Sequence, residues 1–284
     1  MSAGDLISLP WQVELNELLM GPETDFVVRH LDLWAPPEVR QAEQARAQAH
    51  GMSPGRDWFG SRLVAAEFYV IGDTDAIEAV NRQTLTGAWQ PPSDTSAVPL
   101  VWMEDDGIKY RLYGKPRLAS PRVEPRIPTE CRFVATDPLI YSNVESSAST
   151  GLSTAVGGLS FPATAPFVFG SAGTGNTMSC PNDGNTATSW VATFTGPLIA
   201  PELVHVGSGK RISLTGASLA AGETLVVDSG PGKHTVLYMG TTSRYSWLAA
   251  ASQWFDLEPG ANSVTLLGAS GAGSVSIAWR SAWI

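Results

Sequence analysis

Short strand signals recur about every 8–12 residues through the second half of the sequence, and this spacing restricts the fold more than any other feature. β-branched and aromatic residues concentrate at 223–228, 236–238, 264–267 and 274–283, with turn residues such as Ser229-Gly-Pro-Gly232 between them. Residues 274–283 alternate small or polar with apolar side chains, which is the period of a strand. Repeated short strands without a helix predict a β-sandwich.

The first half shows strand signals interrupted by one predicted helix over 74–85. Asp73 or Thr74 is suited to cap its first N–H groups, and acidic residues follow in the first turn. Its expected apolar stripe is Ile77, Val80 and Leu85, and Gly87 is expected to end it. Strands are predicted at 11–20, 26–34, 62–71, 100–104, 109–113, 118–123 and 130–135.

The segment 38–50 has good helix propensity, but it offers only Ala and one Val to a core. We therefore predict a solvated arm or an extended strand here. Gly51, Pro54, Gly55 and Gly60 continue it as a loop, so the expected arm covers residues 38–60. Exposed segments of this kind, together with the N-terminal strand, are suited to contacts between copies of a chain.

Charge divides the chain into two parts. Residues 1–142 hold 20 acidic and 13 basic residues, whereas residues 143–284 hold 7 and 5, for a formal net charge of −9. Residues 143–158 are rich in Ser, Thr, Ala and Gly, which is typical of a linker. We predict a first domain at 1–142, a linker at 143–160 and a second domain at 161–284 that opens with a proline-containing edge strand at 161–169.

An acidic chain does not hold DNA by neutralising phosphates, although it could line a passage that DNA traverses. The two cysteines, Cys131 and Cys180, are too few for a disulfide scaffold and are predicted to be buried free thiols. No apolar run approaches the roughly 18 residues of a membrane helix, and the N-terminus lacks the pattern of a signal peptide. We expect synthesis and folding in a cytoplasm.

Two glycine-containing segments resemble parts of phosphate-binding loops. Gly207-Ser-Gly-Lys210 is followed by Arg211 instead of Ser or Thr, and Val204 stands where an earlier glycine is required. Residues 170–175 are glycine-rich, but no helix follows to present its N-terminus to a phosphate. We interpret the first segment as a turn and the second as a flexible loop.

Acidic and histidine side chains do not form a convincing site in the sequence. Residues 182–185 and 104–107 lack the spaced ligands of a calcium loop and are interpreted as turns. The histidines at 30, 50, 205 and 234 are isolated from one another and from cysteine. No Gly-x-Ser-x-Gly elbow occurs, and the acids at 228 and 258 lie at turns. We expect no catalytic, cofactor-binding or metal-binding residue, no cofactor and no enzymatic activity.

Four of the ten tryptophans, Trp247, Trp254, Trp279 and Trp283, lie near the end of the chain. They could stack on sugar rings or fill the core of a sandwich. Core packing is the favoured interpretation for Trp254 and Trp279. For Trp247 and Trp283, sugar stacking and core packing both remain open.

The order of these features resembles the siphovirus distal tail proteins over essentially the whole chain. No single motif is diagnostic, but the collinear set is fairly specific. In the second half the resemblance rests on Thr195–Pro201, Val226–Ser229, Trp254–Asn262 and Ala278–Trp283. In the first half it rests on Val13–Gly21, on Arg62 at the start of its strand, on the single helix and on Phe133–Tyr141.

This resemblance implies a structural virion protein of a long non-contractile tail, located at the tail tip. The first domain would be a split β-barrel that forms a hexameric ring, and the second a galectin-like β-sandwich. Implied partners are other copies of the chain, the tail tube protein and a tail-associated lysin or tail-tip hub protein. Receptor-binding proteins and host glycans are further candidates, while DNA would pass without specific binding. A carbohydrate-binding module is the alternative function, and a depolymerase or lysin ranks third.

Overall fold

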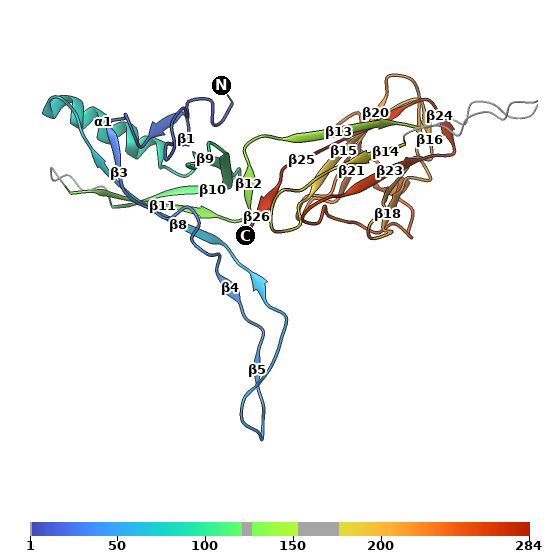
Figure 1. The fold of residues 1–284 in the computed structure, drawn as a ribbon, viewed down its shortest axis with the longest axis horizontal. Coiled ribbons are helices and arrows are strands. Elements are labelled where there is room, and N and C mark those ends of the chain that lie inside the picture. Colours follow the sequence, from blue (N-terminus) through green and yellow to red (C-terminus); the bar gives the residue numbers. More distant parts are fainter. Residues whose placement is uncertain (1, 121–126, 153–175) are drawn as a thin grey trace, which may run out of the picture. The chain divides into compact units, whose positions relative to one another are not determined.

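The computed structural model describes residues 2–120, 127–152 and 176–284, and its regular structure is mainly β, as predicted (Figure 1). The chain forms two compact units. The first contains residues 1–143 and 283–284, and the second contains residues 144–282. The chain therefore passes from one unit to the other at 143–144 and again at 282–283. Each unit has its own hydrophobic core.

The first unit is built on one antiparallel sheet with the strand order β2-β1-β9-β10-β11-β8-β3, and β12 and β26 pair beside β10. β2 and β3 are its two end strands. The bounds are β1 Val13–Leu15, β2 Leu18–Met20, β3 Phe26–Leu31, β8 Arg62–Val70, β9 Val98–Met103, β10 Lys109–Ser120, β11 Thr129–Ala135, β12 Ile140–Ser142 and β26 Ala282–Trp283.

Two strand predictions for this sheet need correction. The segment predicted as one strand at 11–20 is a hairpin, because Asn16 and Glu17 have φ angles of 49° and 65° and reverse the chain between β1 and β2. The strands predicted at 109–113 and 118–123 form one strand, β10, up to Ser120, and residues 121–123 lie outside the described residues. Gly114 lies where they join, and a Cβ there would approach the carbonyl oxygen of Val134 to 2.3 Å.

Helix α1 (Asp75–Ala88) begins as predicted, since the Thr74 hydroxyl accepts a hydrogen bond from the Ile77 amide at 3.3 Å. It continues through Gly87 and ends at Ala88, so the predicted end was wrong. The predicted stripe was also wrong at two positions, because Ile77 and Val80 are exposed. Only the C-terminal end of α1 packs on the core, where the adjoining Trp89 ring lies 5.8 Å from that of Phe68. Within the described ranges no helix has the length and apolarity to cross a membrane.

The second unit contains a six-stranded sheet of order β13-β25-β15-β20-β21-β22, a four-stranded sheet of order β14-β23-β17-β18 and the short sheet β19-β16-β24. Their bounds are β13 Ser146–Gly151, β14 Thr177–Ser179, β15 Trp190–Thr195, β16 Leu198–Ile199, β17 Glu202–His205, β18 Arg211–Ser213, β19 Ser218–Leu219, β20 Thr224–Asp228, β21 Thr235–Tyr238, β22 Thr242–Ser243, β23 Ser263–Leu267, β24 Ser270–Gly271 and β25 Ser274–Trp279. A 3-10 helix, η1 (Tyr245–Trp247), follows β22.

One core lies between the two larger sheets, since alternate side chains of each are buried together. Trp190 is fully buried in this core and donates its indole N–H to the carbonyl oxygen of Phe255 at 2.8 Å. This two-sheet arrangement is the sandwich that the strand spacing predicted, while its galectin-like character remains a prediction.

The linker predicted at 143–160 is wrong for residues 146–151. These residues form β13 and pair in register with β25, from Ser146↔Trp279 to Gly151↔Ser274. Small side chains suit a strand on a sheet edge as well as a linker, so composition did not separate the two. Residues 153–160 and the edge strand predicted at 161–169 lie outside the described residues.

Both cysteines are buried free thiols, as predicted. Burial raises the pKa of Cys131 to about 12 and that of Cys180 to about 11. Because the thiolate is the reactive form, both side chains are protected twice, by protonation and by packing.

We therefore expect neither thiol of the native chain to react with an aromatic disulfide reagent at pH 8 within minutes, and both to react after unfolding in guanidinium chloride. A Ser53→Cys variant is the control, because Ser53 is exposed on the arm. That variant should show one fast thiol per chain. Fast labelling of the unmodified native chain would contradict the packing described here.

Candidate assembly surfaces

The segment predicted as an arm extends from the sheet of the first unit (Figure 1). Every residue from 38 to 59 is exposed. The arm is a long hairpin with two short ladders, and its strands are β4 Val39–Arg40, β5 Gln44–Ala45, β6 Met52–Ser53 and β7 Trp58–Phe59. The expectation of an extended arm in place of a helix is therefore confirmed.

The two faces of the arm differ in chemistry at its base. Val39 pairs with Phe59, and Arg40 pairs with Trp58. Directly opposite residues share a face, so one face is apolar and the other combines an arginine with an indole. Arg56 extends the second face, since its guanidinium carbon lies 4.0 Å from the centre of the Trp58 ring. Trp58 and Phe59 are each 52% exposed. Large aromatic surfaces of this kind are typical of interfaces.

Arg62 fixes the root of the arm. Its Nε donates to the carbonyl oxygen of Pro138 at 2.8 Å, and its Nη1 donates to that of Ala35 at 2.6 Å. The side chain is buried, and its Nη2 has no partner among the described residues. Desolvation lowers the pKa of Arg62, while the nearby Asp32 opposes that shift. Arg62 thus joins the start of the arm, its end and the connection between β11 and β12.

An aromatic cluster holds the segment that leads into the arm. Glu104 accepts hydrogen bonds from the indole N–H groups of Trp34 and Trp102, at 2.8 and 2.9 Å. The rings of Trp34 and Trp283 each make an edge contact with Tyr110, at centroid distances of 5.4 and 5.2 Å. Trp283 therefore packs on the core of the first unit.

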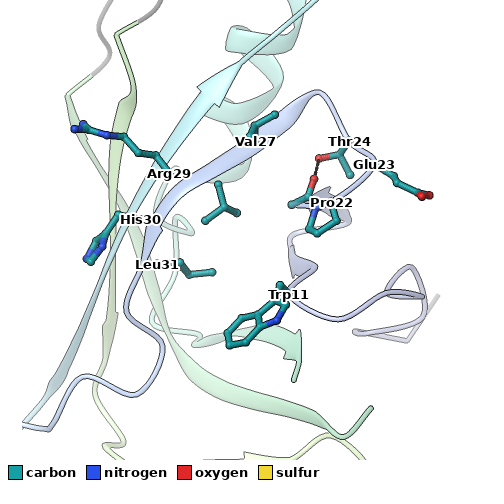
Figure 2. A pocket seen from close by; sticks show the side chains of 10 residues that line it. Trp11, Pro22, Glu23, Thr24, Val27, Arg29, His30 and Leu31 are labelled. Carbon is teal, nitrogen blue, oxygen red and sulfur yellow. Dashed lines mark hydrogen bonds between the residues drawn. The ribbon is translucent and has the colours of Figure 1, made fainter. Parts of the chain in front are cut away.

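A groove of about 570 Å³ lies between β3 and the turn that follows β2 (Figure 2). Leu31 points into it and Trp11 forms the opposite wall, whereas Arg29 and His30 point away. The Trp11 indole is held by a 2.7 Å hydrogen bond to Asp105. Pro22, Glu23 and Thr24 form the rim. The groove therefore has apolar walls at Leu31 and Trp11, and it borders an edge of β3 that has no ladder partner among the described residues.

A third exposed apolar surface accompanies α1. Ile77 and Val80 are 43% and 60% exposed, and Ile71, just before the helix, is 48% exposed. Helix residues three apart lie on one face, so Ile77 and Val80 form a short apolar stripe that the core of this unit does not cover.

The acidic turns predicted from sequence are turns. In the hairpin between β9 and β10, the Asp106 carboxylate accepts the Ile108 amide at 2.8 Å. In the segment 182–185, the side-chain oxygen of Asn182 accepts the Gly184 amide at 3.1 Å. Across the described ranges no group of three or more His, Cys, Asp or Glu side chains is placed to hold a metal.

Gly207–Lys210 forms the turn between β17 and β18, with Gly209 at a φ of 69°. Residues 170–175 lie outside the described residues. The turn also explains His205, which is buried between the Ser208 hydroxyl at 2.8 Å and the Asn262 side-chain oxygen at 3.0 Å. Sequence reasoning missed this Ser–His–Asn contact. The three groups tie the turn to the neighbouring loop.

The remaining histidines are surface residues. His30 lies on β3 and His50 near the tip of the arm, and His234 stacks on Trp254 at a centroid distance of 4.4 Å. Trp279 is buried as predicted, whereas Trp254 and Trp247 are partly buried against the core. Of the four tryptophans near the end of the chain, Trp247 contacts an exposed arginine, Arg244.

Comparison with known proteins agrees with this architecture. Residues 183–283 match the family model of the siphovirus-type tail component, C-terminal domain. A comparison with curated proteins finds no match.

Among solved structures, the fold is similar to that of the SPP1 Dit (gp 19.1) protein, described as a paradigm of the hub adsorption apparatus in phages that infect Gram-positive bacteria. The TM-score is 0.68 at 14% identity, over 96% of this chain and 99% of that chain. The phage P2 baseplate in its activated conformation matches with a TM-score of 0.51 both with Ca and with Sr. The identities are 7% and 6%, over 95% of this chain and 97% of each of those chains.

The fold and its exposed surfaces define a two-unit, mainly β protein with an exposed arm. The predicted resemblance to the siphovirus distal tail proteins is confirmed, because residues 183–283 match the tail-component domain and 96% of the chain shares the fold of the SPP1 Dit protein.

Replacing Arg62 tests the root of the arm. An Arg62→Met variant leaves the carbonyl oxygens of Ala35 and Pro138 without their donor, and we expect the free energy of opening of β8 and β11 to fall by about 2 kcal/mol. Hydrogen exchange of these strands should then be roughly thirtyfold faster. The control is Arg29→Met on β3, which breaks only an exposed ion pair with Glu67 and should cost less than about 1 kcal/mol. Equal hydrogen-exchange rates of β8 and β11 in the two variants would show that the Arg62 hydrogen bonds do not stabilise these strands.

Proposed function

We propose that this chain is the distal tail protein of a siphovirus, a structural hub that forms a hexameric ring at the end of the tail tube. The ring would join the tube to the tail-tip hub protein or tail-associated lysin, and DNA would pass through it. Support comes from the likeness to a hub protein and to baseplate chains. Location in the virion at the tail tip, and a non-enzymatic role, follow from the same proposal.

The observation that carries the proposal is the arm. Twenty-two consecutive exposed residues project four large apolar side chains, Val39, Met52, Trp58 and Phe59, that the chain itself does not cover. Exposing these apolar side chains to water is energetically unfavourable. Contact with another copy of the chain would remove that surface from water.

The groove between Trp11 and β3 is the acceptor that we propose for the arm of the neighbouring copy. The unpaired edge of β3 offers backbone donors and acceptors to an added strand. The apolar wall suits the face of Val39 and Phe59. An arm on one side and an acceptor on another form a head-to-tail interface, which closes into a ring when the rotation permits.

Light scattering after size-exclusion chromatography tests this interface. The full chain should have six times the mass of one chain, whereas a Trp58→Ser/Phe59→Ser double variant should be monomeric with an unchanged thermal transition. A Gln48→Ser variant near the tip of the arm is the matched control and should remain hexameric. A monomeric full chain at every concentration, or a hexameric double variant, would reject the proposal.

Complementation separates the two halves of the interface. A Trp11→Ser variant should also be monomeric, because it removes one wall of the acceptor. Mixed with the arm variant in equal amounts, it should give dimers, since each pair then contains one intact arm and one intact groove. Two monomers that stay separate would show that the arm binds elsewhere.

The acid excess of residues 1–142 supports a further feature of this ring. We propose that part of it faces the channel, where like charge would let DNA slide without binding. A density map of the ring with a basic lumen would contradict this arrangement.

A further inference from the structure

A group of aromatic and basic side chains lies at one edge of the second unit, where β22 and η1 follow β21. Arg244 is the residue between β22 and η1, and its backbone amide donates to the carbonyl oxygen of Val236 at 2.8 Å. Tyr238 ends β21, and Trp247 ends η1. The sheet therefore fixes the backbone of Arg244. One aromatic residue of the group, Tyr238, precedes Arg244 in the sequence, and another, Trp247, follows it.

The Arg244 guanidinium lies against both rings. Its central carbon is 5.8 Å from the centre of the Tyr238 ring and 5.3 Å from that of Trp247. The rings themselves meet edge to face at 5.9 Å. Contact with aromatic faces orients a guanidinium and leaves the N–H groups at its edge available.

Both rings are held in place by further contacts. The Tyr238 hydroxyl donates to Glu223, whose other oxygen accepts the Ala220 amide at 2.8 Å. The hydrogen bond lowers the pKa of Glu223 and raises that of Tyr238, so the first is ionised and the second is protonated at neutral pH. Trp247 packs on Gly216, where an added Cβ would approach its Cδ1 to 2.9 Å.

Arg244 differs from the other cations of this unit in having no acidic partner. Arg211 pairs with Glu202, Lys233 with Asp228 and Arg280 with Glu145, while Lys210 faces Asp256. Arg244 makes no ion pair or side-chain hydrogen bond with the residues that the structure describes. Its guanidinium is exposed, oriented and unneutralised.

We propose that Arg244, Tyr238, Trp247 and the exposed ring of Tyr245 form a binding site for an anionic group of a cell-surface glycopolymer. The guanidinium would take a carboxylate or phosphate through its planar N–H edge. Tyr245 and Met239, which are 49% and 51% exposed, would contact the C–H faces of the adjoining sugar or polyol units.

The size of the site favours a polymer segment over a protein partner. A stable protein interface needs about 800 Å² on each side, with several apolar anchors at its centre. Here the contacts join one cation and two rings, those of Tyr238 and Trp247. A site of this size suits one charged group and its immediate neighbours.

The site does not depend on ring assembly. If the proposed hexamer forms, six such sites on one particle would strengthen weak single contacts through multivalency. If the chain is monomeric, the single site is still testable, so failure here and failure of the ring proposal can be distinguished.

Titration calorimetry with the full chain tests the site in buffer containing 0.15 M salt, at about physiological ionic strength. The probes are a glycerol-phosphate oligomer, an oligogalacturonate and neutral dextran. At least one anionic probe should bind, and dextran should not. The two anionic probes distinguish a phosphate from a carboxylate as the recognised group.

Matched variants decide whether Arg244 is responsible. Arg244→Gln should weaken binding by about tenfold or more, and Arg244→Lys should recover only part of it, because lysine lacks the planar fork. Lys233→Gln removes the same charge from an exposed ion pair and should change binding less than about twofold. Equal losses in the Arg244→Gln and Lys233→Gln variants, or no binding of either anionic probe, would overturn the proposal. Unchanged thermal transitions establish that all variants are folded.

Discussion

The sheet of the first unit ends in two strands, β2 and β3, that are not joined to each other by a ladder within the described ranges. An end strand exposes a row of backbone donors and acceptors, which a closed barrel would have satisfied internally. The groove beside Trp11 lies at this opening. Folding therefore leaves the first unit with an edge that a second chain can complete, and the proposed ring follows from that incompleteness.

The arm poses a related problem, because it has no core of its own. Its two ladders are each two residue pairs long, and a two-stranded hairpin is marginally stable in water. Order is imposed at the root, where Arg62 bonds to Ala35 and Pro138 and where the Glu38 amide donates to the Ser61 carbonyl oxygen at 3.0 Å. The direction in which the arm leaves the sheet is thus set by buried contacts at its base.

Local patterns predicted the elements whose stability is local. Period-two alternation located the strands of the second unit, and the capping residue Thr74 located the start of α1. The predictions were wrong where contacts between residues far apart in the sequence determine the structure. Nothing near Ile77 and Val80 in the sequence indicates that only the end of the helix meets the core. The strand at 146–151 exists because β25 offers it a partner more than 120 residues away.

The candidate surfaces were also predictable to different degrees, depending on whether local sequence or distant contacts determine them. Low apolar content at 38–50 marked the first part of the arm, since a segment that offers only Ala and one Val to a core is expected to be exposed. The groove required knowledge of which strands end the sheet, and sequence spacing does not contain that. Arg62 stands at the start of its predicted strand, but its role depends on the carbonyl oxygens of Ala35 and Pro138, which only the fold brings together.

Charge gives the isolated arginine of the second unit its significance. A chain with a net charge of −9 repels polyanions at long range, so nonspecific attraction does not bring them to its surface. Binding must then come from a contact within a few ångströms, where an oriented guanidinium is most effective. At a Debye length of about 8 Å, physiological salt screens the general repulsion more than that close contact. A polyanion held at the proposed Arg244 site should consequently tolerate salt better than one held by a basic surface.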